Sequence, residues 1–171
     1  MNFSQGSASN DYIARTAISQ CQLVTPDLLL INFTGMARKE HVDDKTIRNL
    51  LPAEKPDGIA RAFYRNYMAS EGLLNAVKNI LLVQFFCKTN DINFLFAWVI
   101  IECSRLPTLW IPSAGPLISV VDRGHFCDFG LKDSDIFIDI ARDLVHPGPR
   151  SHNMFASRIY EKLTNRSSAC T

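Results

Sequence analysis

Apolar residues along this chain fall into two kinds of segment, short continuous runs and longer stretches with helical spacing. Continuous apolar runs of strand length are typical of strands that are buried on both faces of a parallel sheet. Three segments fit that pattern: Leu28–Phe33, Asn79–Phe86 and Thr108–Ile111. Apolar residues that recur on one helical face, or all round a helix, predict five helices: Asp11–Gln20, Ile59–Val77, Asn90–Ser104, Asp135–Arg142 and Asn153–Asn165.

Turn-forming and polar residues separate these segments. Asn10 is the expected N-cap of the first helix, and Gly72 is expected to interrupt the second. The polar stretch 38–58 is expected to be irregular apart from a short helix at Lys45–Leu51, and His146–His152 is expected to be a Pro/Gly-rich loop. Strands that alternate with helices predict an α/β fold with a parallel sheet, in which functional loops lie at the carboxyl ends of the strands.

Composition narrows the function classes. The chain has 171 residues and a net charge of +1, which fits one domain over residues 1–171 without a basic surface for nucleic acid. Its apolar runs are too short to cross a bilayer and its first residues lack a signal peptide, so we expect a cytoplasmic protein without a membrane span. His125, Cys127 and Asp128 are compatible with a metal cluster, but ordinary alternation of polar and apolar residues explains them as well. No Cys-x-x-Cys pair or nucleotide-binding motif occurs, so no metal or cofactor is expected.

The sharpest chemical signal is the segment Asp143-Leu-Val-His146-Pro-Gly-Pro-Arg-Ser-His152. A histidine that acts as general base needs its second ring nitrogen held by a carboxylate, which fixes the tautomer and stabilises the imidazolium. A tight loop ahead of a helix can bring Asp143 and His146 beside one nucleophile. The alternative is a loop histidine with an unrelated aspartate nearby. His152 is expected to cap or pack at the start of the last helix rather than to react.

This segment resembles the last sequence block of SGNH (GDSL-like) hydrolases, in which Asp and His three residues apart precede a proline and a C-terminal helix. The resemblance implies a three-layer α/β/α sandwich of flavodoxin-like topology. It also implies an ester or acyl hydrolase, like the carbohydrate and lipid esterases, with Asp143 and His146 as its catalytic pair. The substrate would then be a small-molecule ester or a glycan.

The N-terminal residues resemble a second block of the same family, in which a turn leads into a helix and a glycine N–H helps to form the oxyanion hole. In the stretch Gly6-Ser7-Ala-Ser-Asn10, the resemblance implies that role for Gly6 or for Ser7, one residue along, with Asn10 at the helix start. An ordinary helix start capped by serine or asparagine is the alternative.

The strand Leu28–Phe33 resembles the strand that leads into the third block of the family. Thr34, Arg38 and Glu40 fit a branch of the family with the pattern Thr-x-x-x-Arg-x-Glu, which implies oxyanion or substrate contacts for Thr34 and Arg38. A loop ion pair between Arg38 and Glu40 is the alternative.

The nucleophilic serine of that family lies in a Gly-Asp-Ser block on the first strand, and no Gly-Asp-Ser occurs in this chain. The resemblance therefore implies an N-terminally incomplete domain whose sheet lacks its first strand, and a chain that is inactive alone. Two other readings remain open: a non-catalytic SGNH-fold module that binds a carbohydrate or a partner protein, and an unrelated α/β interaction domain. Without a central first strand, Leu28–Phe33 would expose an apolar edge that recruits a complementing N-terminal segment or a second copy.

Overall fold

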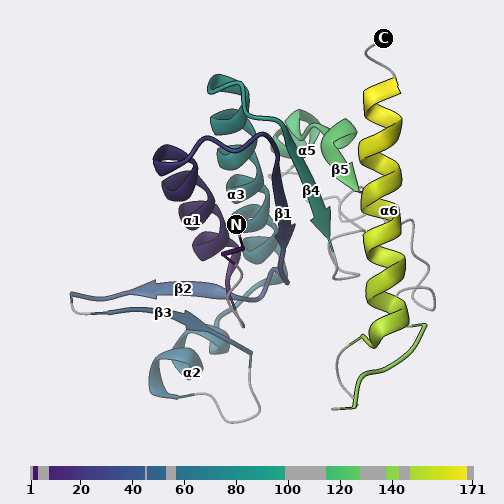
Figure 1. Ribbon diagram of the computed structural model, residues 1–171. Coiled ribbons are helices and arrows are strands. Elements are labelled where there is room, and N and C mark those ends of the chain that lie inside the picture. Colours follow the sequence, from purple (N-terminus) through teal and green to yellow (C-terminus); the bar gives the residue numbers. More distant parts are fainter. Residues whose placement is uncertain are drawn as a thin grey trace.

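A parallel sheet of three strands forms the centre of the structure, a computed structural model that describes residues 2–3, 8–44, 46–52, 57–98, 115–127, 138–142 and 147–168. The strands lie side by side in the order β1 (Leu29–Phe33), β4 (Phe94–Trp98) and β5 (Phe126–Cys127). Leu29 is opposite Phe94 in the first pair, and Phe96 is opposite Phe126 in the second. Because the strands are parallel, their carboxyl ends share one edge of the sheet (Figure 1). The predicted α/β fold with a parallel sheet is confirmed.

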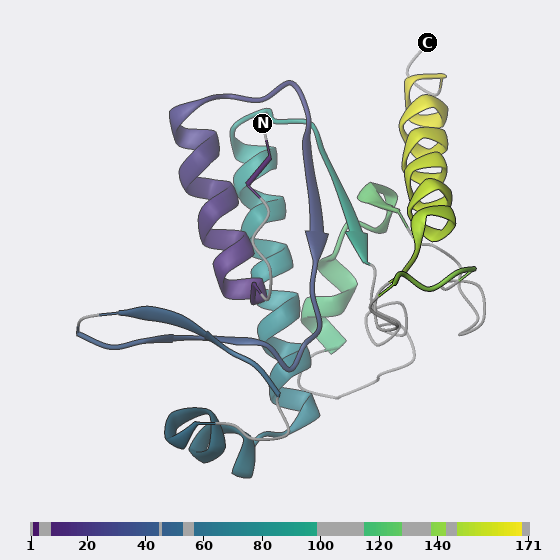
Figure 2. The ribbon, with the colours of Figure 1, turned by 60° about the horizontal axis from the view of Figure 1, so that its bottom comes forward.

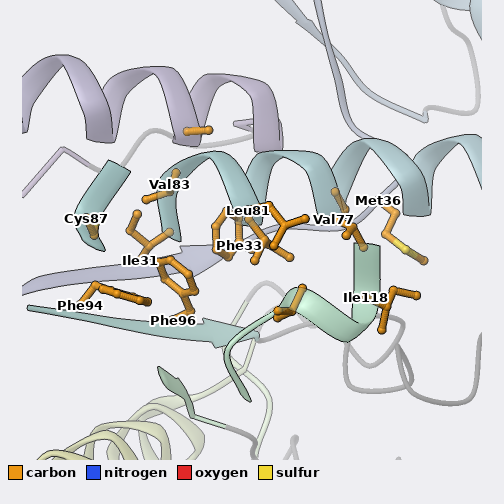
Figure 3. Packing of buried hydrophobic residues seen from close by; sticks show 14 of the residues in the cluster. Ile31, Phe33, Met36, Val77, Leu81, Val83, Cys87, Phe94, Phe96 and Ile118 are labelled. Carbon is orange, nitrogen blue, oxygen red and sulfur yellow. The ribbon is translucent and has the colours of Figure 1, made fainter. Parts of the chain in front are cut away.

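Three helices cover one face of this sheet: α1 (Asn10–Leu23), α3 (Ala69–Thr89) and α5 (Gly115–Val120). Figure 3 shows α3 lying along the strands, with Val77 and Val83 turned toward their side chains. Alternation along β1 and β4 sends Phe33 and Phe96 to this face, where their rings meet edge to face at 5.2 Å. Full burial of each such side chain stabilises the fold by about 2 kcal/mol.

The helix α6 (Pro149–Ser168) packs on the opposite face (Figures 1 and 2). Phe155 from its second turn meets Ala97 of β4 and Cys127 of β5 in a small separate core. Helices therefore cover both faces of the sheet, as in other parallel α/β proteins. Within the described residues, no helix combines the length and the apolar character that a membrane span needs.

Strand β1 is the open side of the sheet, since among the described residues it pairs with β4 alone. Leu30 of β1 and Leu95 of β4 are opposite each other and point to the face on which α6 packs. Leu30 is 48% exposed, whereas Leu95 is 0% exposed. On the face where α6 packs, β4 is therefore buried and β1 is exposed to solvent. Burial of Leu28–Phe33 on both faces was expected, and it holds only for the face with Ile31 and Phe33.

An antiparallel hairpin extends from the carboxyl side of the sheet (Figure 2). It consists of β2 (Lys39–Val42) and β3 (Ile47–Leu50), and its turn is closed by the Thr46 N–H, which donates to Asp43 Oδ1 at 2.8 Å. The short helix predicted at Lys45–Leu51 is wrong, because the described part of that segment is strand β3.

The helices α2 (Gly58–Arg65) and α3 replace the single helix expected at Ile59–Val77. The interruption falls at residues 66–68, and Gly72 lies inside α3 instead. The strand predicted at Asn79–Phe86 is wrong, since all of it belongs to α3. The helix predicted at Asn90–Ser104 is also wrong in its described part, which contains strand β4. An apolar run packed on several sides has no period that separates a strand from a helix.

The C-terminal part differs from the expectation in two places. Residues 138–142 are not helical, so the described part of the helix predicted at Asp135–Arg142 is wrong. Pro149 already begins α6, so that helix starts inside the predicted loop His146–His152. The predicted strand Thr108–Ile111 lies outside the described residues.

Candidate functional site at the carboxyl edge of the sheet

The start of α1 is fastened to the end of β1 by one buried amide. Asn10 donates its Nδ2–H to the Thr34 carbonyl oxygen at 3.1 Å and accepts the Thr34 N–H on Oδ1 at 2.8 Å. The N-cap of the helix is Ser9, not Asn10 as predicted, because Ser9 Oγ accepts the N–H of Tyr12. Two of the predicted site residues, Asn10 and Thr34, are thus brought together at the carboxyl edge. The described contacts of Asn10 go to backbone, which makes it a brace for this turn.

Asp11, the next residue, accepts from four donors in two elements, β2 and α3. Its carboxylate accepts from the Glu40 N–H at 3.1 Å, from Asn79 at 3.0 Å, from Asn75 at 3.1 Å and from the Lys39 ammonium. Burial alone would raise the pKa of Asp11, but these hydrogen bonds and the Lys39 charge outweigh it and lower that pKa. The Asp11 carboxylate therefore ties the hairpin to α1 and α3.

Arg38 and Glu40 do not form the loop ion pair considered from the sequence. Glu40 binds Arg15 of α1 instead, with Nη2 and Oε1 2.8 Å apart. Arg38 begins the approach to β2 and lies close enough to Tyr64 to lower the pKa of its phenol, although burial raises that pKa to about 12 overall. Arg38 is half-buried beside this aromatic group, and its role in substrate contact stays a prediction.

The start of α6 is built around Asp139. Its carboxylate accepts the N–H groups of Arg150 and Ser151 at 3.0 and 2.8 Å and the Ser151 hydroxyl at 2.8 Å. Its carbonyl oxygen accepts the Gly148 N–H at 2.9 Å. Burial would raise the pKa of Asp139, and the hydrogen bonds from Arg150 and Ser151 lower it more strongly. A carboxylate at this position satisfies the free N–H groups of the first helical turn and suits its dipole.

These contacts close the loop that contains the proposed acid–histidine pair. Ile140 and Pro147 form an isolated antiparallel bridge directly inside the Asp139 contacts, so the two ends of segment 140–147 are held together. The first turn of α6 lies on the same side of the sheet as the carboxyl ends of β1 and β4 (Figure 1). Asp143 and His146 themselves lie outside the described residues, and so do Gly6 and Ser7. His152 lies in α6, where its ring approaches Phe155 edge to face.

A second polar cluster occupies the other edge of the sheet, at the start of β4. The ring of His125, in the short helix η1 (Arg123–His125), stacks on Phe94 at 4.2 Å, and its Nδ1 lies 3.1 Å from Asp122 Oδ2. Cys127 packs on the opposite face of the sheet, in the small core under α6. His125 and Cys127 thus face different surroundings, which favours plain alternation over a shared metal site. Among the described residues, no group of three metal-ligating side chains occurs.

Sequence reasoning missed the residues that hold this edge together. Asn75 and Asn79 are four apart, and their common partner Asp11 shows that the spacing marked one face of a helix. Pro149 at the first position of α6 and Ser151 in its first turn are residues typical of a helix start, so the sequence did indicate where Asp139 could cap a helix. Comparison of the chain with family models, with curated proteins and with solved structures finds no match.

Proposed function

We propose that this chain is the acid–base part of an SGNH-type ester or acyl hydrolase. His146 acts as general base, Asp143 orients its ring, and the nucleophilic serine comes from outside these 171 residues. The fold in this proposal is the flavodoxin-like sandwich of that family. The substrate is a small-molecule ester or an esterified glycan.

The observation that supports it most is that the two ends of segment 140–147 are held together at the start of α6. The Asp139 contacts and the bridge between Ile140 and Pro147 form a hydrogen-bonded base for the segment that includes Asp143 and His146. Catalytic residues in parallel α/β sheets lie on loops at the carboxyl edge, where this base is found. The Asn10–Thr34 brace at the same edge belongs to the second and third segments that resemble the family.

Proton NMR of the chain tests the acid–histidine pair directly. A histidine whose ring N–H is held by a carboxylate gives a strongly deshielded N–H proton. We expect such a signal in the wild type, and we expect its loss in Asp143→Asn and in His146→Gln. His152→Gln is the matched control and should keep the signal, because His152 lies in α6. Absence of the signal from a folded wild type, or its loss only in His152→Gln, would overturn the pair.

The source of the serine is tested with activity reagents. The chain alone should neither turn over p-nitrophenyl acetate nor react with a fluorophosphonate, because it has no Gly-Asp-Ser. Mass spectrometry after labelling identifies any modified residue. Stoichiometric labelling of Ser7, Ser9 or Ser134 would show that the nucleophile is in this chain after all.

The second candidate is a non-catalytic SGNH-fold module that binds a carbohydrate or a partner protein. The missing Gly-Asp-Ser favours it. The NMR experiment distinguishes the two candidates, since a binding module has no need for a carboxylate that orients His146. A folded chain in which Asp143→Asn and His146→Gln leave the deshielded region of the spectrum unchanged would favour the binding module.

A further inference from the structure

A cavity of about 250 Å³ lies between α2, α3 and the beginning of the hairpin. None of its lining residues belongs to the loop 140–147 or to α6, so it is separate from the proposed acid–histidine pair. Gly72 is one of its lining residues, and the absence of a side chain there lets Tyr67 lie close against α3. A Cβ at that position would collide with the Tyr67 hydroxyl and would stand 2.9 Å from the Met36 carbonyl oxygen.

The two ends of the cavity differ in character. One wall is a stripe of α3 from Glu71 through Asn75 to Lys78, which spans about 10 Å at about 1.5 Å per residue. Near the Lys78 end the Lys39 ammonium lies 3.1 Å from Asn75 Oδ1. Near the Glu71 end the wall is aromatic, because Tyr67 reaches over Gly72.

The middle of the cavity is apolar. Met36 and Leu74 line it, and Phe63 stands beside Tyr67 with its ring centroid 5.8 Å away. Pockets of this kind, largely apolar with a few convergent polar groups, are typical of small-molecule sites.

The charges of the lining groups select the ligand. Lys39 is already paired with Asp11, Nζ to Oδ2 at 3.3 Å. Lys78 is exposed and forms no ion pair with any residue that the structure describes. Its ammonium is thus the uncompensated charge at that end. Glu71, at the aromatic end, disfavours a second anionic group there.

We propose that this cavity binds a small carboxylate with an aromatic or medium-length alkyl body, its carboxylate at Lys78 and its apolar part between Met36, Leu74 and Phe63. The ammonium of Lys78 donates charge-assisted hydrogen bonds to the carboxylate oxygens. The apolar body leaves water for the aromatic end, and that burial supplies the rest of the affinity.

Titration of the whole chain with phenylbutyrate, and with its neutral analogue phenylbutyramide, tests the site. Affinity is measured by calorimetry, and the location by proton–nitrogen NMR signals of Gly72–Lys78. We expect the carboxylate to bind about tenfold more tightly than the amide, because the amide can accept a hydrogen bond from Lys78 but carries no charge opposite to that of the ammonium.

Two variants separate the two ends. Lys78→Gln should weaken phenylbutyrate by about tenfold and leave phenylbutyramide unchanged. Phe63→Leu should weaken both ligands. Lys88→Gln, on the same helix but away from the cavity, is the matched control and should change neither. Equal affinity for acid and amide, an unchanged affinity in Lys78→Gln, no binding, or NMR shifts confined to other parts of the chain would each overturn the proposal.

Discussion

Lys88 and Asp122 form the closest ion pair among the described residues, with Nζ 2.7 Å from Oδ2. Burial would raise the pKa of Asp122, but Lys88 and His125 outweigh it and lower that pKa from 3.8 to about 2. A depressed carboxyl pKa stabilises the fold above the unfolded-state value and ceases to do so as the pH falls toward the folded-state value.

We therefore expect Lys88→Gln to lower the free energy of unfolding by about 1 kcal/mol near neutral pH, a value limited by solvent screening of two partly exposed groups. The deficit relative to the wild type should shrink as the pH falls from 3.8 toward about 2. Urea unfolding across that range measures it, with Lys78→Gln as a control that has no such pH dependence. A stability difference between Lys88→Gln and the wild type that grows as the pH falls would contradict the lowered pKa of Asp122.

Tyr64 joins α2 to the hairpin, since its hydroxyl donates to the Ala37 carbonyl oxygen at 2.7 Å and lies 3.0 Å from that of Leu50. Tyr64→Phe should lower the free energy of unfolding by about 1 kcal/mol, because both hydrogen bonds of the hydroxyl are lost. Burial, with the nearby Tyr67, raises the pKa of Tyr64 from 10.0 to about 12. The contribution of Tyr64 to the stability of the fold is therefore complete below pH 10 and is lost as the pH rises toward 12. Absorbance titration of tyrosinate should show one late-titrating group that Tyr64→Phe removes.

At the scale of elements, the first turn of α6 depends on a glycine. A Cβ on Gly148 would lie 2.5 Å from Asp139 Oδ2, so Gly148→Ala should displace the carboxylate that caps the helix. We expect hydrogen exchange at the N–H groups of Arg150 and Ser151 to quicken by about tenfold, because their acceptor moves away. Gly58→Ala is the control, since nothing lies within 4 Å of a Cβ there. Unchanged exchange at both N–H groups would show that Asp139 can move aside without loss.

The sequence predicted the helical ends of the chain better than its middle. The first and last helices have one apolar face each, and that spacing locates α1 and α6 to within a few residues. The run at Asn79–Phe86 hides its helical period because Leu82 and Phe85 are apolar although exposed, whereas Gln84 is polar although buried. Strand β4 is equally apolar, and only the turn at Asn90-Asp91, where Asp91 has φ 52°, separates it from α3.

The candidate site was predictable only in part, for a physical reason. Asn10 and Thr34 could be proposed from sequence, yet their mutual hydrogen bonds depend on the end of β1 lying beside the start of α1. The Asp139 contacts involve Ser151 across a loop whose closure no local pattern reveals. Likewise, the cavity beside Gly72 forms only when Phe63 and Tyr67 come to lie beside α3.

For the molecule as a whole, the open side of β1 predicts association. Leu28 and Leu30 are exposed beside an edge that pairs only with β4 among the described residues. We expect the isolated chain to self-associate along β1 or to need a complementing strand, because unpaired apolar edges recruit further strands. Leu30→Lys should reduce that association without loss of the fold, whereas Leu82→Lys, equally exposed on α3, should not.

Sedimentation velocity of the three proteins measures this directly. A wild type that stays monomeric at the concentrations used for structural work, with the same sedimentation coefficient as Leu30→Lys, would refute the association. Equal dissociation by Leu82→Lys would place the contact on α3 instead.

The parallel pairing of β1 with β4 also governs the order of events during synthesis. The hairpin, α2 and α3 all lie between the two strands in sequence, so β1 leaves the ribosome long before Phe94–Trp98 becomes available. Pairings between strands that are distant in sequence are slow to form, whereas the hairpin and helices close through near neighbours. The nascent chain therefore exposes an apolar, unpaired strand until the residues of β4 have been synthesised. The yield of native protein should depend on translation speed and on chaperones that shield Leu29–Phe33 until its partner arrives.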